Sequence, residues 1–207
     1  MKDPELTSPH YNDLDGSLDY AWSLIEDGAN NRRSAFHTPA VSTVSDNGTP
    51  QSRILVLRHA DKAKRLLRFN SDTRSPKVAE IAANSKMSVL LYDSETKVQL
   101  RLSGNAHTCT TGPQVDEIWH NADRYARRCY MTQGAPSSMS DHPTSGLPAS
   151  VEGRKPEESE LIPARDNFAL LIFEAAQIDW LYLATQGHRR ARWVWRDGNW
   201  QGSWAFP

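Results

Sequence analysis

The residues best suited to chemistry are basic side chains that stand beside an apolar strand or at the start of a helix. Arg53 and Arg58 bracket an apolar stretch. Arg74 and Lys77, together with the hydroxyl residue Ser75, fall where a helix is expected to begin. Free N–H groups at a helix N-terminus attract anions, and neighbouring Arg and Lys side chains strengthen a phosphate site. Taken alone, the second group is explained more simply by a solvated turn in which Ser75 caps the helix.

Two further stretches have the chemistry to contact a planar ring. Gln99 lies in a segment of alternating polar and apolar residues, where a glutamine ordinarily faces solvent. Its amide donates and accepts at once, which suits the N–C=O edge of a flavin or pyrimidine. Residues 187–196 mix basic side chains with Trp193 and Trp195, a combination that binds single-stranded nucleic acid. An edge strand whose tryptophans pack into the core explains the same residues.

Familiar catalytic and metal-binding motifs are missing from the sequence. There is no Gly-rich phosphate loop, no nucleophile elbow and no His-Glu-x-x-His. The residues able to bind a metal match no usual zinc spacing: His107, Cys109, His120 and Cys129. We therefore expect no metal site, and no residue is identified as a catalytic acid, base or nucleophile.

The composition favours a cytoplasmic protein. The chain has 24 Lys and Arg against 25 Asp and Glu, so no overall charge draws it to nucleic acid or to a membrane. No run approaches the roughly 18 apolar residues of a membrane span. The first 18 residues are acidic and lack an apolar stretch, which argues against a signal peptide. Two cysteines do not make a disulfide scaffold.

These side chains must be positioned by a fold in which strands predominate. Alternating or apolar segments predict strands at 40–44, 52–58, 65–69, 87–92, 97–107, 168–173, 179–184, 192–196 and 200–206. Helical spacing predicts helices from 17 to about 28, over 75–84, and from 115 to about 128. Six or more strands with few helices between them indicate a mainly β fold, an antiparallel barrel with peripheral helices.

The domain organisation is expected to be simple. Residues 1–16 are polar and predict a loose N-terminal arm, and residues 17–207 predict a single domain. Inside this domain, residues 131–163 are rich in Ser, Pro and Gly and have few large apolar side chains. A stretch of that length without structure is usually a functional lid or partly disordered. We therefore expect a flexible loop or lid there.

The order of these pieces resembles the pyridoxamine 5′-phosphate oxidase-like family of FMN-binding split barrels. Five motifs in register, which together span about residues 40–207, carry the resemblance: DNGTPQSRILVLR at 46–58, FNSDTRSPKVAEI at 69–81, VQLRLSG at 98–104, QIDW at 177–180 with RAR at 190–192, and the terminal WAFP at 204–207. The turn at 71–77 is longer than in the vitamin B6 enzyme and resembles a related FMN-binding branch. The resemblance implies a six-stranded antiparallel split barrel with flanking helices.

The same resemblance implies a homodimer that holds FMN at its interface and assigns a role to each residue. The FMN phosphate would be held by Arg53, Arg74, Ser75 and Lys77, with Asn70 and Ser71 lining the same site. Backbone groups of Ile54 and Leu55 would meet the flavin ring, and Gln99 its polar edge. Arg192 would approach the ring from the second subunit.

Departures from the family pattern leave the substrate open. Arg58 replaces a family lysine, and His188-x-Arg190-x-Arg192 replaces Arg-x-His-x-Arg, so Arg58 and Arg190 are the candidate substrate residues. No Tyr, Arg and Ser clamp for a substrate phosphate is recognisable in residues 119–138. We expect an FMN-dependent oxidoreductase with an unknown small substrate and poor turnover of pyridoxamine 5′-phosphate. The alternatives are a flavin carrier or sensor without efficient turnover and, less favoured, a haem- or nucleic-acid-binding split barrel.

Overall fold

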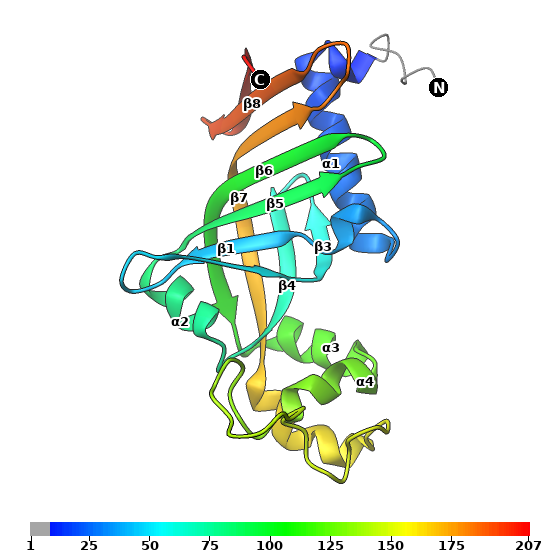
Figure 1. Cartoon of the computed structure of the whole chain (residues 1–207), viewed down its shortest axis with the longest axis vertical. Helices are drawn as coiled ribbons and strands as arrows, with labels where there is room; N and C mark the ends of the chain where they lie inside the picture. Colours follow the sequence, from blue (N-terminus) through cyan, green and yellow to red (C-terminus); the bar gives the residue numbers. More distant parts are fainter. Residues whose placement is uncertain (1–8) are drawn as a thin grey trace.

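The computed structural model describes residues 9–207, which form a sheet with one long helix beside it and a helical lobe at one end (Figure 1). The strands are β1 (Ala40–Val44), β2 (Pro50–Ile54), β3 (Leu57–Asp61), β4 (Leu66–Asp72), β5 (Lys86–Asp93), β6 (Val98–Cys109), β7 (Phe168–Tyr182), β8 (Arg189–Arg196) and β9 (Asn199–Ala205). The α-helices are α1 (Leu14–Asn30), α2 (Pro76–Ala83), α3 (Pro113–Asn121) and α4 (Arg124–Arg128). Short 3-10 segments are η1 (Pro9–Tyr11), η2 (Ala35–His37), η3 (Cys129–Met131) and η4 (Glu158–Asn167).

The strands form one antiparallel sheet in the order β2-β1-β5-β6-β7-β4-β3, and β8 pairs with both β7 and β9. The predicted mainly β fold with peripheral helices is therefore confirmed. The six-stranded barrel is corrected, because within residues 9–207 the sheet has nine strands and hydrogen bonds do not close it. The predicted strand 52–58 divides at residues 55–56, since β2 pairs with β1 whereas β3 pairs with β4.

Alternation along the strands separates a buried face from an exposed one. In β6, Val98, Leu100 and Leu102 are fully buried, while Arg101 and Ser103 between them are exposed. The helix α1 covers part of this core with Trp22 and other buried side chains. At the β4–β7 end, the opposite face is covered by α3 and η4, which pack on Leu170 and Ile172.

Glycine is required at one point where β6 and β7 approach closely. The register between these strands shifts at Ser103 and Gly104. A Cβ atom on Gly104 would lie 2.0 Å from the carbonyl oxygen of Glu174, which no side chain tolerates. This bulge keeps both long strands paired along their whole length, so the predicted strands 168–173 and 179–184 are one strand, β7.

The predicted loose arm is corrected in its described part. Tyr11 is buried and its ring stacks on that of Tyr182 with centroids 4.1 Å apart. Asp13 caps α1 by accepting the Gly16 N–H at 2.6 Å. The burial of Tyr11 and the helix cap at Asp13 therefore fix this segment to the rest of the domain, and residues 1–8 lie outside the described part.

The lobe below the sheet contains α3, α4, η3 and η4. The single helix predicted over 115–128 is two, because the chain turns at Ala122 and Asp123 begins the second by accepting the Tyr125 N–H at 2.8 Å. A separate small core fills the lobe, with Trp119, Tyr130 and Phe168 in mutual aromatic contact. The long segment between η3 and η4 has no helix or strand.

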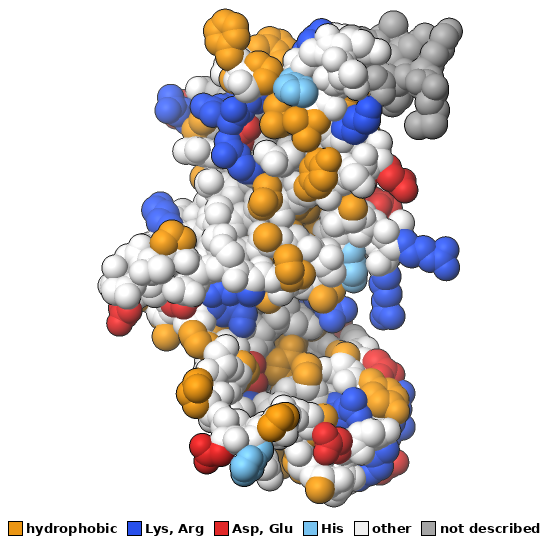
Figure 2. Space-filling model, in the orientation of Figure 1, with side chains coloured by type: hydrophobic (Ala, Val, Ile, Leu, Met, Phe, Trp, Pro, Cys, Tyr) orange, Lys and Arg blue, Asp and Glu red, His pale blue; other side chains and the backbone are white. Residues whose placement is uncertain are grey.

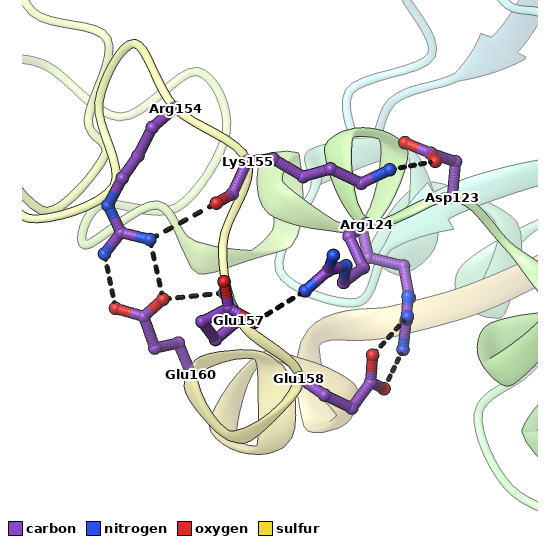
Figure 3. A network of polar contacts seen from close by, with 8 residues as sticks. Asp123, Arg124, Arg154, Lys155, Glu157, Glu158 and Glu160 are labelled. Carbon is purple, nitrogen blue, oxygen red and sulfur yellow. Dashed lines mark hydrogen bonds and ion pairs between the residues drawn. The ribbon is translucent and has the colours of Figure 1, made fainter.

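Ion pairs tie that irregular segment to the helices of the lobe (Figure 3). The pairs are Lys155 with Asp123 at 2.7 Å, Arg124 with Glu157 at 2.8 Å, Arg127 with Glu158 at 2.6 Å, and Arg154 with Glu160 at 2.6 Å. The flexibility predicted for residues 131–163 stays a prediction. Within residues 9–207, no helix is both long and apolar enough to cross a bilayer.

Candidate functional site

The basic residue of β2 is joined to the helix α2 by a short chain of polar contacts. Arg53 pairs with buried Val41, so its side chain lies on the inner side of the sheet. One guanidinium nitrogen donates to Thr43 Oγ1 at 2.5 Å and the other lies 3.1 Å from Glu80 Oε2. The Thr43 hydroxyl donates to the same carboxylate. These contacts hold Arg53 beside the first turns of α2.

Lys77, in the first turn of α2, is a half-buried cation without a counter-ion. Burial lowers its pKa and the neighbouring Arg53 lowers it further, while Asp72 and Glu80 act in the opposite direction. Among the described residues, no carboxylate oxygen lies within ion-pair distance of its Nζ. In the first turn of α2, Pro76 has no N–H and the Val78 N–H donates to the Ser75 carbonyl at 2.9 Å, so Lys77 offers a place for an anion through its side chain and its own N–H.

The two residues that precede α2, Arg74 and Ser75, differ in their hydrogen bonds. Ser75 is 4% exposed and precedes the helix, but its side chain makes no capping hydrogen bond, contrary to the solvated-turn interpretation. Arg74 is already engaged: it binds both oxygens of Asp72 at 3.0 and 2.7 Å and donates to the Thr132 carbonyl at 2.8 Å. The bonds to Asp72 raise the pKa of Arg74. Arg74 therefore ties the turn to the lobe, and its predicted role in phosphate binding stays a prediction.

One face of β4 carries polar atoms that lack partners. Asn70 Oδ1 and Arg68 Nη1 are both buried, and neither has a hydrogen-bond partner among residues 9–207. Ser71 alternates with Asn70 and lies on the other face, where its hydroxyl donates to the Asp72 carbonyl at 3.3 Å. The structure thus separates the predicted pair Asn70 and Ser71. The sequence interpretation missed Arg68, whose signal was its alternation with Asn70 and Asp72.

Four further predicted residues lie on the outer face of the sheet: Ile54, Gln99, Arg190 and Arg192. The register places Ile54, Arg101 and Arg192 in one row across the strands and Gln99 and Arg190 in the next. Figure 2 shows basic side chains gathered over β8 on this side of the molecule. Leu55, which directly follows Ile54, is half-buried, and its N–H donates to the Pro39 carbonyl at 3.1 Å.

A single carboxylate organises the basic side chains of this outer face. Asp179 accepts hydrogen bonds from Arg101 at 2.7 Å, Arg190 at 2.8 Å and Arg192 at 2.9 Å. Burial alone would raise the pKa of Asp179, but the bonds from Arg190 and Arg101 outweigh it and the pKa is lowered. Three cations on one anion leave an excess of positive charge beside a hollow of about 570 Å³ that Ser42 and Leu90 also line.

Comparison with known proteins identifies the cofactor class of the domain. The family model for the FMN-binding domain of pyridoxamine 5′-phosphate oxidase matches residues 20–110. The chain carries a pyridoxamine 5′-phosphate oxidase-like FMN-binding domain. FMN is therefore its cofactor, and the matched range contains the inner cluster and both strands beside it.

Curated relatives of this FMN-binding domain include two oxidases. The chain is 25% identical over 167 residues to pyridoxine/pyridoxamine 5′-phosphate oxidase 2 of Arabidopsis thaliana, covering 76% of this chain and 79% of the relative. It is 31% identical over 90 residues to pyridoxine/pyridoxamine 5′-phosphate oxidase of Granulibacter bethesdensis, 42% of each.

Solved structures share the fold over nearly the whole chain. A pyridoxamine 5′-phosphate oxidase-related, FMN-binding protein of Nostoc punctiforme has a TM-score of 0.70 and 23% identity, covering 93% of this chain and 96% of its own. PhzG of Burkholderia lata 383, solved with tetrahydrophenazine-1-carboxylic acid, has a TM-score of 0.68 and 18% identity, with 98% of both chains covered.

The inner cluster fits an FMN phosphate by its chemistry. A phosphate monoester needs several fixed donors and positive charge, and Arg53, Lys77 and Ser75 supply both without a blocking acid on Lys77. The unpartnered Asn70 acceptor suits a hydroxyl of the ribityl chain. Asn70, Gln99 and Arg192 all lie on the face of the sheet opposite to Arg53, so one chain does not bring all predicted cofactor residues together.

Proposed function

We propose that this protein is an FMN-dependent oxidoreductase that acts on a small molecule. The observation that carries the proposal is Lys77, a half-buried cation left unpaired beside Arg53 at a helix N-terminus within an FMN-binding domain. When bound, FMN supplies the transfer of a hydride or of electrons. The protein's own part is to hold the cofactor, to orient the substrate and to tune charge around the ring.

The residues divide this work by position. Arg53, Lys77 and the Ser75 hydroxyl hold the phosphate, with the N–H of Lys77 in the first turn of α2. The Asn70 side chain accepts from the ribityl chain. The backbone at Ile54 places the ring at the edge of the sheet, where the side chain of Ile54 is 62% exposed.

Completing the flavin site requires a second copy of this chain. Gln99 and Arg192 face outward, away from Lys77, so they reach a flavin only on a neighbouring subunit. The outer face also exposes Ile54, Leu90 and Tyr92, apolar side chains suited to an interface. A two-fold dimer, in which each copy gives its outer face to the other's site, satisfies both observations. Arg192 would then stabilise negative charge on the ring.

The predicted failure to oxidise pyridoxamine 5′-phosphate efficiently gains support from the lobe. The three arginines of α4, which lie nearest to the missing clamp in the sequence, already have partners. Arg124 and Arg127 pair with glutamates, and Arg128 donates to the carbonyls of Val151 and Arg154 at 3.3 and 2.8 Å. We expect kcat/KM for this substrate below about 10⁴ M⁻¹s⁻¹ in a steady-state assay. A higher value would contradict this expectation.

Purified protein tests the proposal directly. We expect FMN in the released cofactor by mass spectrometry, a dimer by light scattering, and bleaching of the flavin absorbance by a substrate or a reduced nicotinamide. Leu90→Asp should give a monomer that has lost flavin. FAD alone, or a flavin-bound monomer, would refute the site described here, while FMN that no substrate reduces would favour a carrier or sensor. The cytoplasmic location stays a prediction.

A further inference from the structure

Two tryptophans of the β8–β9 hairpin form an aromatic corner. Trp195 and Trp200 are directly paired across the two strands, and their ring centroids lie 5.4 Å apart with the ring planes at 73°. Both side chains are only partly buried. Because side chains alternate along a strand, Trp195 lies on the same face of β8 as buried Trp193 and on the opposite face from Arg192. The corner is therefore separate from the outer face that we assign to the neighbouring subunit's flavin.

The aromatic corner forms one wall of a pocket of about 570 Å³. The other walls are Glu26 of α1 and residues 60–63, at the end of β3 and in the turn that follows, and α1 lies beside β3 (Figure 1). Among residues 9–207, those that line the pocket include no member of the phosphate cluster at α2 and none of the outer face. A pocket of this volume suits a small organic molecule.

The charges around this pocket leave one carboxylate without a partner. Each cation of the β3–β4 turn already pairs with an acid: Lys62 with Asp19 at 2.7 Å, Lys64 with Asp61 at 3.4 Å, and Arg65 with Glu174. Glu26 is half-buried, and among residues 9–207 its carboxylate has no hydrogen bond or ion pair. The pocket therefore presents an unpaired negative charge beside two indole rings.

One of these rings already contacts a cation within the chain. The guanidinium carbon of Arg65 lies 4.0 Å from the centroid of the Trp195 ring, whereas no cation of residues 9–207 lies over the ring of Trp200. The face of an indole attracts cations, and aromatic sites of this kind recognise quaternary ammonium groups. Two indoles at a steep angle contact a compact group on two sides, whereas a flat neutral ring would stack on only one of them.

We propose that this pocket binds a small molecule that carries a methylated ammonium group. The indoles of Trp195 and Trp200 contact its methyl groups, and Glu26 supplies the opposite charge. Asp61 lines the same pocket, but Lys64 neutralises it. The site is additional to the flavin site, and its occupant would contact α1, the β3–β4 turn and the β8–β9 hairpin together. Binding should therefore raise the melting temperature of the protein.

The experiment titrates purified holoprotein with choline and with neohexanol, in which a carbon atom replaces the choline nitrogen, by calorimetry at constant ionic strength. Glu26→Gln removes the carboxylate charge and keeps the size of the side chain, and Trp200→Leu replaces the indole by an apolar group without a ring. Asp27→Asn is the matched control, because it removes the same charge from the next position of α1, which is exposed. The melting temperature and the flavin content are measured for each variant.

We expect choline to bind about tenfold more tightly than neohexanol, because only choline carries the charge that the indoles and Glu26 attract. Glu26→Gln should weaken choline binding about threefold or more and leave neohexanol unaffected, while Asp27→Asn changes either affinity by less than about twofold. Trp200→Leu should weaken choline binding at least as much as Glu26→Gln. The flavin content should be the same in all variants.

Equal affinities for choline and neohexanol would overturn the proposal, as would the absence of saturable choline binding by the wild type. Choline binding that is unchanged in Glu26→Gln would place the cation elsewhere and overturn it too. If Trp200→Leu does not fold, as its melting temperature will show, Glu26→Gln decides the outcome alone. Loss of flavin from Glu26→Gln would contradict the separation of this pocket from the flavin site.

Discussion

The lobe and the β4–α2 end of the sheet use the same kinds of cation in opposite ways. In the lobe, Arg124, Arg127 and Arg154 each meet a glutamate at 2.6–2.8 Å. At the β4–α2 end, Lys77 and Arg68 are half-buried and have no acid within ion-pair distance among the described residues. Paired cations hold a segment in place, whereas unpaired and partly desolvated cations are available to bind an anionic ligand.

The largest expected effect on FMN affinity comes from introducing a carboxylate at the β4–α2 end of the sheet. Ser75→Asp places a carboxylate at the start of α2, within reach of the cations that we assign to the phosphate. Like charges opposed in a partly buried site cost several kcal/mol, so FMN affinity should fall about a hundredfold. The apoprotein should keep or gain thermal stability, because Asp is a good N-cap. Fluorescence titration with FMN measures the first effect and thermal unfolding the second.

Ser75→Asn separates charge from shape in that experiment. It is close in size to Asp and caps helices equally well but carries no charge. FMN affinity within about tenfold of wild type in Ser75→Asn, with the large loss confined to Ser75→Asp, supports the comparison. Equal losses in both variants would mean that the hydroxyl or the space, and not the charge, matters.

In the lobe, removing a paired cation should affect stability and leave the cofactor alone. Arg127 is 4% exposed, binds both oxygens of Glu158 at 2.6 and 2.7 Å, and lies 5.4 Å from the Trp119 ring centroid. Arg127→Met should lower the free energy of unfolding by about 1–3 kcal/mol, because charge-assisted bonds and a cation–π contact are lost. Urea unfolding checks this, and FMN affinity should change less than twofold.

An exposed pair provides the control within the same lobe. Arg124 and Glu157 have side chains that are 34% and 73% exposed. Exposed pairs contribute about 0.2–1 kcal/mol, so Arg124→Met should cost clearly less than Arg127→Met. A tenfold loss of FMN affinity in either variant would break the division between the two regions.

The smallest effect is a pH dependence of the lobe. The bonds from Arg154 and then from the Glu157 N–H lower the pKa of Glu160 from its usual 4.5 to about 2. Because the folded value lies below the unfolded one, this stabilisation is fully present above about pH 4.5 and is lost as pH falls toward 2. Urea unfolding at several pH values should show Glu160→Gln less stable than wild type above pH 5 and equal to it near pH 2. A difference that does not change with pH would contradict this account.

Local patterns predicted much of the sheet and the core of the site. The alternation at 98–102 correctly separated the two faces of β6, and the predicted helix over 75–84 corresponds to α2. Arg53 and Lys77 were expected at one site because of the family resemblance, and the structure places them near enough for the charge of Arg53 to lower the pKa of Lys77.

The features that the sequence did not predict depend on contacts between residues far apart in the chain. The strand predicted over 52–58 divides because its halves pair with different strands, a choice that no local pattern encodes. Arg68 was missed because its burial depends on the chain folding over β4, while its sequence neighbours resemble those of an ordinary exposed arginine. The unpaired state of a cation is visible only when all its neighbours are placed.

The most direct test of the central claim measures the affinity for FMN and for riboflavin in wild type and in Lys77→Met. The two ligands differ only in the phosphate, so their affinity ratio reports what the protein gains from it. If Lys77 and Arg53 hold the phosphate, the wild type should bind FMN at least a hundredfold more tightly than riboflavin, from two charge-assisted contacts. The ratio should fall about tenfold or more in Lys77→Met, while riboflavin affinity stays within about twofold. An unchanged ratio in Lys77→Met would contradict the claim and place the phosphate elsewhere.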